Sequence, residues 1–425
     1  MKSNTRTYLY ANKLYANKQI GMVTLLTTSL LLIVALVIAL GGYKSTFYEV
    51  KRSQNEVASR QAHWAAEGGV ECGVAQYMIT RTIPTSILAC DPDANFLPEI
   101  VLDPTNNEVV ISATVQRREV SRRFTHSLQM FSGAIQSTSD LYVRGSSSIY
   151  TPDPGQLSDK GWECVAAKYD GELKVVGSID NKGLVHGLPP YDGFDNQGKD
   201  CATSHMTSDS NSSLKSDFQL ESNLKVFESF FNVPIKNHDQ VKNSEVFTVL
   251  EGSISAPGAI KTLPNCGKTL TDEIEKGNTK LWVEGSCEIG TTELHALSQA
   301  SAKTKGILLV VHEGLFSIMG TGSLNGILFH FNQDFSPELA LWDGFEAGVY
   351  LQHVANDFDL SYRERTSYYQ HGSFTVTGGQ LFETPDPQVA IFNNSLAFNY
   401  NRDVIDYARH GLTSTTWKKG SWRDY

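Results

Sequence analysis

The chain has 425 residues, with 36 Lys and Arg side chains against 46 Asp and Glu, and its formal net charge at pH 7 is −10. This acidic excess excludes binding of nucleic acid through overall charge. One local basic patch interrupts it, formed by Arg117, Arg118, Arg122 and Arg123 and divided by Glu119. We interpret the patch as the solvated end of a hairpin, and we expect no nucleic-acid partner.

The first segment in chain order is a basic leader, residues Met1 to Gly21. No acidic residue occurs before Glu49, and Met22 to Leu40 contains nineteen residues without a charge. As a helix this apolar run spans roughly 28 Å, enough to cross a bilayer once. Because basic residues favour the cytoplasmic side, the leader predicts a cytoplasmic N-terminus. Its basic residues are Lys2, Arg6, Lys13 and Lys18.

The segment that follows, Lys44 to Ile79, also predicts a helix. It lacks proline, and its apolar residues recur near helical spacing. A secretory signal peptide would have a shorter apolar core followed by a small-x-small cleavage site, whereas this run continues through Gly41 and Gly42. We therefore expect the membrane helix to continue out of the bilayer. An ordinary single-span anchor with an uncut tail explains the hydropathy equally well.

Two short motifs flank this helix. Gln19-Ile20-Gly21 precedes the apolar run, and Ala65-Ala66-Glu67-Gly68-Gly69 lies near its far end. Together they resemble the N-terminal region of PilX-type minor pilins, a type IV prepilin family. The resemblance covers about eighty of the 425 residues. It implies that a prepilin peptidase cuts after Gly21, that Met22 becomes the new N-terminus, and that the helix Met22 to Leu40 makes the filament contacts. Its contact residues would include Leu25, Leu26, Leu30, Ile33 and Leu36.

One position departs from the family pattern. The fifth residue after the predicted cut is Leu26, where major pilins have a Glu that is thought to meet the N-terminal amine of a neighbouring subunit. An unpaired charge is costly in an apolar filament core, so a subunit without this carboxylate pairs poorly as a repeating unit. Leu26 therefore favours a low-copy tip or priming role, and it leaves open a protein that is never cleaved or assembled.

The six cysteines all follow the membrane span, and their even number indicates an oxidising compartment. Pairing of sequence neighbours would join Cys72 with Cys90, Cys164 with Cys201, and Cys266 with Cys287. Each such bridge would stabilise the fold by roughly 3 kcal/mol. Other connectivities remain open, since six cysteines allow fifteen. The spacing gives no zinc motif, and we expect no metal and no cofactor.

After the helix, the chain becomes rich in strand-forming residues. Ile100 to Leu102, Val109 to Val115 and Val120 to Met130 are separated by turn signals, which predicts a small antiparallel meander over residues 81–130. Packed on the end of the long helix, this meander would make a small pilin-like head.

From Phe131, short apolar strands are separated by glycine or asparagine, as in Leu141 to Gly145, Leu173 to Gly177 and Leu315 to Phe329. This pattern fits the rungs of a right-handed parallel β-helix. Because long insertions make the period irregular, a β-sandwich remains an alternative. Residues 131–425 also resemble the β-solenoid domain that often follows PilX-type N-terminal segments, for which the closing motif Gly420-Ser421-Trp422-Arg423-Asp424 is typical.

Within this region, residues 178–244 are rich in Ser, Asn and Asp and predict surface excursions. One stripe inside them predicts an amphipathic helix that covers the solenoid. Its residues are Leu220, Leu224, Phe227 and Phe231. The aromatic-rich stretch Trp342 to Tyr369 allows either a sugar-binding face or core packing, and we favour core packing.

The same sequence contains a few candidate catalytic groups. Asp357 and Asp359 are two residues apart on an expected strand, with Arg363 and Arg365 nearby, a weak signal for a polysaccharide-cleaving site. His312 and His330 would lie on adjacent rungs, but a pair without a third ligand favours a structural role over a metal site. No phosphate loop or Ser-His-Asp order occurs. We therefore expect no catalytic residues and no enzyme activity.

The sequence thus predicts an α+β, mainly β protein: a leader (1–21), a transmembrane and extended pilin-like helix (22–80), a β meander (81–130) and a β-solenoid-like domain (131–425). The expected function is that of a minor pilin or pseudopilin, at the tip or in priming, with a head for surface contact or adhesion. The family resemblance implies a bacterial inner-membrane protein with a periplasmic C-terminal domain, found at the cell surface or pilus tip after assembly. Its expected partners are other minor pilins, the assembly platform and prepilin peptidase. The alternative is an uncleaved membrane-anchored β-helix that binds or degrades extracellular polysaccharide.

Overall fold

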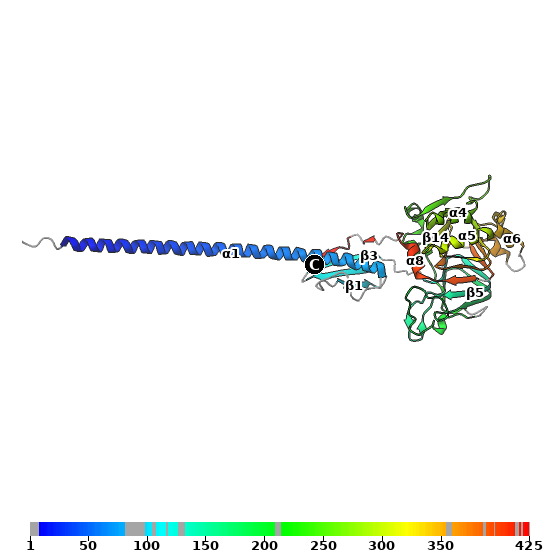
Figure 1. Ribbon diagram of the computed structural model, residues 1–425, viewed down its shortest axis with the longest axis horizontal. Helices are drawn as coiled ribbons and strands as arrows, with labels where there is room; N and C mark the ends of the chain where they lie inside the picture. Colours follow the sequence, from blue (N-terminus) through cyan, green and yellow to red (C-terminus); the bar gives the residue numbers. More distant parts are fainter. Residues whose placement is uncertain are drawn as a thin grey trace, which may run out of the picture. The chain divides into compact units, whose positions relative to one another are not determined.

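The computed structural model divides the chain into two compact units that are interleaved in sequence (Figure 1). Unit 1 comprises Met1–His126 and Thr415–Tyr425, and unit 2 comprises Ser127–Ser414. Unit 2 is therefore an insertion between two parts of unit 1. The structure describes residues 8–80, 98–103, 108–115, 118–125, 132–208, 214–353, 359–385, 388–394, 396–412, 416–417 and 420–424.

Unit 1 is built around one long helix, α1 (Tyr8–Thr80). Its part from Gly21 to Ala75 is long and apolar enough to cross a membrane, and the most apolar stretch of it is not buried within the protein. The long N-terminal apolar helix predicted from the sequence is thus confirmed. This finding is consistent with single-pass membrane anchoring.

The C-terminal half of α1 carries a small antiparallel sheet (Figure 1). Its first strands are β1 (Pro98–Asp103), β2 (Glu108–Val115) and β3 (Arg118–Thr125), which pair in that order. On the helix, Ala62, Ala66 and Val70 are buried at intervals of four residues, and Ile111 and Val120 are buried on the strands. Because helix residues four apart share a face, their small side chains let the sheet pack closely. The predicted antiparallel meander is confirmed.

The chain returns to this sheet at its end. Two short strands, β23 (Thr416–Trp417) and β24 (Arg423–Asp424), pair antiparallel with β3. Between them, the Ser421 hydroxyl donates to the carbonyl of Arg123 (3.0 Å) and accepts the Arg123 N–H (3.2 Å). The sequence groups this closing motif with residues 131–425, whereas its strand partner β3 is in unit 1.

Unit 2 contains two sheets in which every strand pair is parallel. The described strands of the first sheet, in spatial order, are β10 (Phe218–Leu220), β8 (Ala167–Tyr169), β4 (Ile135–Ser137), β20 (Gly379–Glu383), β17 (Gly326–Phe331), β14 (Ile307–His312), β12 (Lys280–Glu284) and β11 (Thr248–Glu251).

The second sheet has the described order β13 (Cys287–Ile289), β15 (Phe316–Met319), β18 (Thr366–His371), β21 (Val389–Asn393), β5 (Asp140–Thr151), β22 (Leu396–Asn399), β19 (Phe374–Val376) and β16 (Gly322–Leu324), with β9 (Leu173–Asn181) also on β5. The chain passes repeatedly between the two sheets, since β14, β17 and β20 lie in the first sheet and β15, β18 and β21 lie in the second. The prediction of a mostly β domain with parallel strands is confirmed.

Short helices and a hairpin surround these sheets (Figure 1). The helices are α2 (Val226–Phe231), α3 (His238–Lys242), α4 (Cys266–Glu275), α5 (Thr291–Ala302), α6 (Glu346–His353), α7 (Leu360–Glu364) and α8 (Arg402–Arg409), with 3₁₀ turns at Thr203–His205, Ile235–Asn237 and Leu339–Trp342. The hairpin joins β6 (Leu157–Ser158) to β7 (Gly161–Trp162).

The core consists of side chains stacked in register across the strands. Leu281, Leu309 and Leu328 pair as direct neighbours on β12, β14 and β17, and all three are fully buried. On another side of the same strands, Phe231 of α2 stacks on Phe329 at 5.5 Å between ring centroids. In-register stacking means that each strand supplies the apolar surface that the next one needs.

The predicted covering helix is shorter than its sequence stripe. Phe227 and Phe231 are buried in α2 as expected, but Leu220 ends strand β10 and is 64% exposed. The prediction of one helix from Leu220 to Phe231 was therefore wrong at its start. The backbone hydrogen bonds of β10 are made with β8, and this pairing overrides the helical spacing of the apolar residues.

Candidate functional site

The predicted processing site lies within continuous helix. Gly21 and Met22 are both in α1, and the Thr24 hydroxyl donates to the Gly21 carbonyl at 2.9 Å. Met22 is 73% exposed. The residues that precede Gly21 in α1 are helical from Tyr8, while Lys2 and Arg6 of the leader lie outside the described residues.

The predicted filament residues are exposed and lie on one half of the helix circumference, since successive helix residues are about 100° apart. They are Leu25, Leu26, Leu30, Ile33 and Leu36. Exposed apolar residues such as Leu31 and Ile38 lie on the other half. A helix that is apolar all round suits a bilayer or a packed filament rather than one face of a soluble core. Its hydroxyl groups are satisfied within the helix, since Thr28 and Ser29 donate to carbonyls three or four residues back. Such bonds lower the cost of placing polar side chains in hydrocarbon.

Aromatic rings follow the apolar run. Tyr43, Phe47 and Tyr48 are exposed, and the Tyr43 and Phe47 rings stack at 6.3 Å between centroids. The Lys51 ammonium lies 5.7 Å from the centroid of the Phe47 ring. Tyrosine and lysine favour the interface between hydrocarbon and water, so this segment marks where α1 would leave a bilayer.

Two of the predicted cysteine pairs are disulfides in unit 2, with Cα–Cα distances of 5.5 Å in each: Cys164–Cys201 and Cys266–Cys287. Cys72 in α1 is also disulfide-bonded, and Cys90 lies outside the described residues. The first bridge joins the hairpin region of β7 to the loop that follows β9. The second joins the start of α4 to the start of β13.

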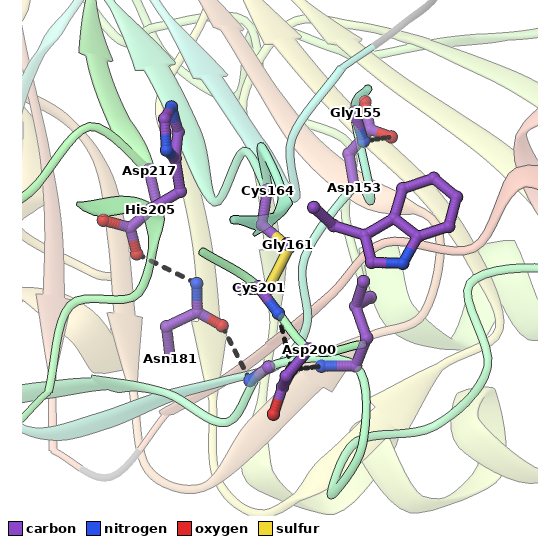
Figure 2. The surroundings of a disulfide bond; sticks show 12 residues. Asp153, Gly155, Gly161, Cys164, Asn181, Asp200, Cys201, His205 and Asp217 are labelled. Carbon is purple, nitrogen blue, oxygen red and sulfur yellow. Dashed lines mark hydrogen bonds between the residues drawn. A yellow bond between two sulfur atoms is a disulfide. The ribbon is translucent and has the colours of Figure 1, made fainter. Parts of the chain in front are cut away.

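A polar network surrounds the Cys164–Cys201 bridge (Figure 2). Asp217, which is fully buried, accepts hydrogen bonds from the Asn181 amide (2.9 Å) and from the Thr207 hydroxyl (2.6 Å). Asp200 accepts the backbone N–H groups of Leu184 (2.6 Å) and Cys201 (2.8 Å). These carboxylates hold the segments around Asn181, Leu184 and Thr207 in place, because each carboxylate replaces solvent for several donors.

A second buried cluster joins α3 to the strands β12 and β14. His312 Nδ1 lies 3.1 Å from the Glu284 carboxylate, and its Nε2 lies 3.5 Å from the Glu313 carboxylate. Lys242 of α3 lies 3.5 Å from the same Glu284. The His312 ring stacks on Phe331 at 4.2 Å between centroids. The cluster holds α3 against the first sheet with paired charges, as buried ions require.

The two carboxylates and the imidazole shift one another's pKa. Burial alone would raise the pKa of Glu284, but the hydrogen bond and charge of His312, with Lys242, lower it to about 2. Burial alone would lower the pKa of His312, but its contacts with Glu284 and Glu313 outweigh burial and raise it. His312 therefore carries a positive charge more readily than an ordinary histidine does.

His312 and His330, which the sequence predicts on adjacent rungs, lie in different surroundings. His330 pairs in register with Val311, next to His312, but it is fully buried and its Nε2 lies 3.0 Å from the Gly314 carbonyl. Burial lowers the pKa of His330 to about 4. Among the described residues, no group of three or more His, Cys, Asp and Glu side chains is placed to hold a metal ion.

The residues weighed for catalysis are not on a common strand. Asp359 caps helix α7 by accepting the Ser361 N–H at 3.1 Å, so the expected strand there was wrong. Arg363 donates to the Leu351 carbonyl (3.0 Å), and Arg365 pairs with Asp140 (2.9 Å). Asp357 lies outside the described residues.

Several residues of the aromatic stretch are buried, and Arg122 of the basic patch makes contacts within unit 1. Trp342, Tyr368 and Tyr369 are fully buried, in line with core packing, while Phe358 lies outside the described residues. In unit 1, Arg122 pairs with Glu71 of α1 at 2.5 Å and lies over the Trp422 ring at 4.4 Å. Arg117 lies outside the described residues.

Glu284 and Glu313 were missed by the sequence reasoning, although a local signal exists. Both precede a glycine at the end of an apolar strand, in Val283-Glu284-Gly285 and His312-Glu313-Gly314. A charged residue at this position lies where a buried strand ends, and neighbouring parallel strands end side by side. Their ionisable groups are therefore brought together there. The partner from α3 carried no such signal, because its contact depends on how residues 178–244 fold back.

The described structure thus defines a class by its layout: an N-terminal apolar helix of pilin-like form that carries a small antiparallel sheet, with a larger unit of parallel sheets inserted after it.

Comparisons with known proteins show only weak similarity. No protein-family model and no curated protein matches the chain. Among solved structures, it is similar to the competence-associated pilin ComZ from Thermus thermophilus at 12% sequence identity, over 86% of this chain and 97% of that chain. The TM-score of 0.21 is too low to carry an argument.

Proposed function

We propose that this protein is a non-catalytic minor pilin or pseudopilin-like subunit of a type IV pilus or a related secretion system. The observation that supports this most is the continuity of α1, which runs from the motif Gln19-Ile20-Gly21 through a run of bilayer length to the face that carries the antiparallel sheet. One element thereby links a membrane anchor to an exported domain, as a pilin subunit requires.

Its proposed place is the tip or the priming complex rather than the shaft. Leu26 stands at the fifth position after the proposed cut, and its exposed side chain provides no carboxylate for the amine of a neighbouring subunit. An incoming charged terminus would stay unpaired in the apolar core of a filament, at a cost of several kcal/mol. A subunit with this property is best suited to a position occupied once.

The proposed partners follow from this role. They are prepilin peptidase, other minor pilins and the inner-membrane assembly platform, with the apolar part of α1 in the bilayer and the antiparallel sheet and unit 2 on the periplasmic side. The motif Gly420 to Asp424, resembling the close of PilX-linked solenoid domains, contributes to unit 1 through β24.

For unit 2 we propose a right-handed β-solenoid. The support is the alternation of β14, β15, β17, β18, β20 and β21 between two parallel sheets, with each strand in register with the one a turn later. A solenoid of this kind would give the head a long rigid surface suited to contact or adhesion. Because Asp359, Arg363 and Arg365 already hold local structure, we propose contact rather than catalysis as its role.

The test of the proposed function is the N-terminus of the protein recovered from membranes and from sheared surface filaments. We expect a mass lower by the leader and a terminus at Met22, and we expect Gly21→Ala to abolish this processing. Gly41→Ala is the matched control, because a Cβ meets nothing within 4 Å at either position of the same helix. An intact Met1 terminus found only in membranes would overturn the pilin proposal and favour the uncleaved anchor.

A further inference from the structure

Unit 2 has a surface cavity of about 700 Å³. It is enclosed by the loop of residues 253–265, the starts of α4 and α5, the end of β13 and the turn of residues 340–345 that precedes α6. Its volume lies within the range of sites that bind small molecules, roughly 300–1,000 Å³.

The walls of the cavity are fixed by cross-links between different elements. The Cys266–Cys287 disulfide ties α4 to β13. Glu288 accepts the N–H groups of Glu346 (2.8 Å) and Ala347 (3.0 Å), which ties β13 to the start of α6. Glu293 of α5 accepts the Gly267 N–H of α4 at 3.1 Å. A ligand would therefore meet a pre-formed site and would not need to order it.

The lining combines apolar surfaces with unused hydrogen-bonding groups. Leu341 and Phe345 supply apolar area, and Phe345 is partly buried against Trp342 at 5.7 Å between ring centroids. The second oxygens of Asp343 and Glu293 and the side-chain amide of Asn265 make no hydrogen bond within the described structure. An aromatic face beside several oxygen acceptors suits a ligand with C–H faces and many hydroxyl donors.

The charge of the lining narrows the ligand further. In the part of the chain that the structure describes, the cavity is lined by Glu288, Glu293 and Asp343 and by no Lys, Arg or His side chain. A phosphate, sulfate or uronic acid would meet uncompensated like charge there, which is unfavourable. The site therefore selects hydroxyl-rich ligands that are neutral or positively charged.

We propose that this cavity binds a carbohydrate without acidic groups, a neutral or amino sugar of a surface glycan. The inference deepens the proposed function, because it rests on the head being a contact domain and names what it contacts. The residues that bind would be Phe345, against the face of the ring, and Asp343 and Glu293, which accept hydroxyl groups.

The experiment is calorimetric titration of the full-length protein in detergent with chitobiose and lactose, with a glucuronic-acid-containing disaccharide as the charged comparison. We expect saturable binding of at least one neutral or amino sugar and none of the acidic one. Phe345→Ala should weaken binding about tenfold, the loss of roughly 1.4 kcal/mol of aromatic contact, and Asp343→Asn should weaken it in the same direction.

Matched controls separate binding from folding. Tyr150→Ala removes an exposed aromatic ring away from the cavity and should bind sugar as wild type does. Phe345→Leu keeps apolar volume without the aromatic face, so it should stay folded and bind sugar weakly. Three results would each overturn the inference: equal binding by Phe345→Ala and wild type, preference for the acidic sugar, or no binding of either chitobiose or lactose. A protein that binds sugar but keeps Met1 would instead overturn only the pilin proposal.

Discussion

Glu383 ends strand β20 as a mostly buried carboxylate, and it accepts the backbone N–H of Phe227 at the start of α2. Burial is the larger effect and raises the pKa of Glu383 to about 7, against the lowering effect of the backbone hydrogen bonds. The folded protein therefore holds a proton at this position over a pH range in which the unfolded chain, with an ordinary glutamate near 4.5, has lost it.

The sign of the linkage gives a prediction for Glu383→Gln. Because the folded pKa is raised, the stability linked to this proton is complete below pH 4.5 and is lost as the pH rises to about 7, by up to about 3 kcal/mol. The glutamine variant, which stays neutral and still accepts the N–H, should lose less stability than wild type between pH 5 and pH 8. Urea unfolding at both pH values measures this difference.

Glu275→Gln is the control, since the Glu275 side chain is exposed. Its unfolding free energy should change with pH as that of wild type does. If Glu383→Gln and wild type lose equal stability between the two pH values, the buried proton is excluded as the cause.

At the residue scale, the sequence predicted which residues lie on adjacent strands better than it predicted the surroundings of their side chains. The alternating strand pattern placed His312 and His330 on adjacent rungs, and the register confirms that they are close. Adjacent residues of a strand point to opposite faces, so one histidine meets Glu284 and Glu313 while the other is buried without a charged partner. The alternation of apolar and polar residues predicts which side chains share a face of the strand. It does not predict which face residues 178–244 cover, because that depends on contacts distant in sequence.

The strands of the second sheet turn at a column of residues with positive φ. These residues, in register on successive strands, are Gly320, Gly372, Asn394, Gly145 and Gly177. Hydrogen bonds connect the column, such as Gly320 N–H to the His371 carbonyl at 2.8 Å and Asn394 N–H to the Arg144 carbonyl at 2.9 Å. Four of the five positions are glycine because side chains rarely adopt this φ and because the backbones approach closely.

Gly372→Ala should therefore be strongly destabilising. A Cβ at Gly372 would overlap the Gly320 carbonyl, a backbone atom that cannot move without breaking the ladder. Gly193→Ala is the control, because Gly193 also has positive φ (72°) but a Cβ there meets nothing within 4 Å. We expect a loss of about 1 kcal/mol for the control, from backbone strain alone, and at least about 3 kcal/mol for Gly372→Ala in urea unfolding. Equal losses would mean that the close approach in the column is not costly.

At the element scale, the short glycine-bounded strands were predictable because each carries its own pattern of apolar residues and turns. Their order was not predictable. β4 and β5 come first in unit 2, yet β4 lies between β8 and β20 in the middle of its sheet. On one side of β4, the chain extends the sheet through β8 and β10. The other side is then built from β11 back to β20. This order depends on pairing between strands that are distant in sequence.

At the scale of the whole molecule, the insertion of unit 2 makes unit 1 depend on both ends of the chain. The edge of β3 that does not face β2 is covered by β23 and β24, and Trp422 packs its ring against Arg122 and, at 6.3 Å, against His63 of α1. An uncovered strand edge exposes unpaired backbone groups. The pairing of β23 and β24 with β3 could not be predicted from the sequence, since both strands are very short and their partner lies about 300 residues earlier.

Deletion of Thr415–Tyr425 should therefore loosen unit 1 and spare unit 2. Without β23 and β24, the amide protons of β3 should exchange with solvent at least about tenfold faster, a loss of roughly 1.4 kcal/mol of local stability. The parallel strands β14 and β17 should exchange as in the full chain, because their hydrogen bonds are made within unit 2. Trp422→Ala, which keeps both strands, should have a smaller effect in the same direction. Hydrogen exchange followed by mass spectrometry measures both regions at once, and unchanged protection of β3 in the deletion would show that the small sheet is stable without its C-terminal strands.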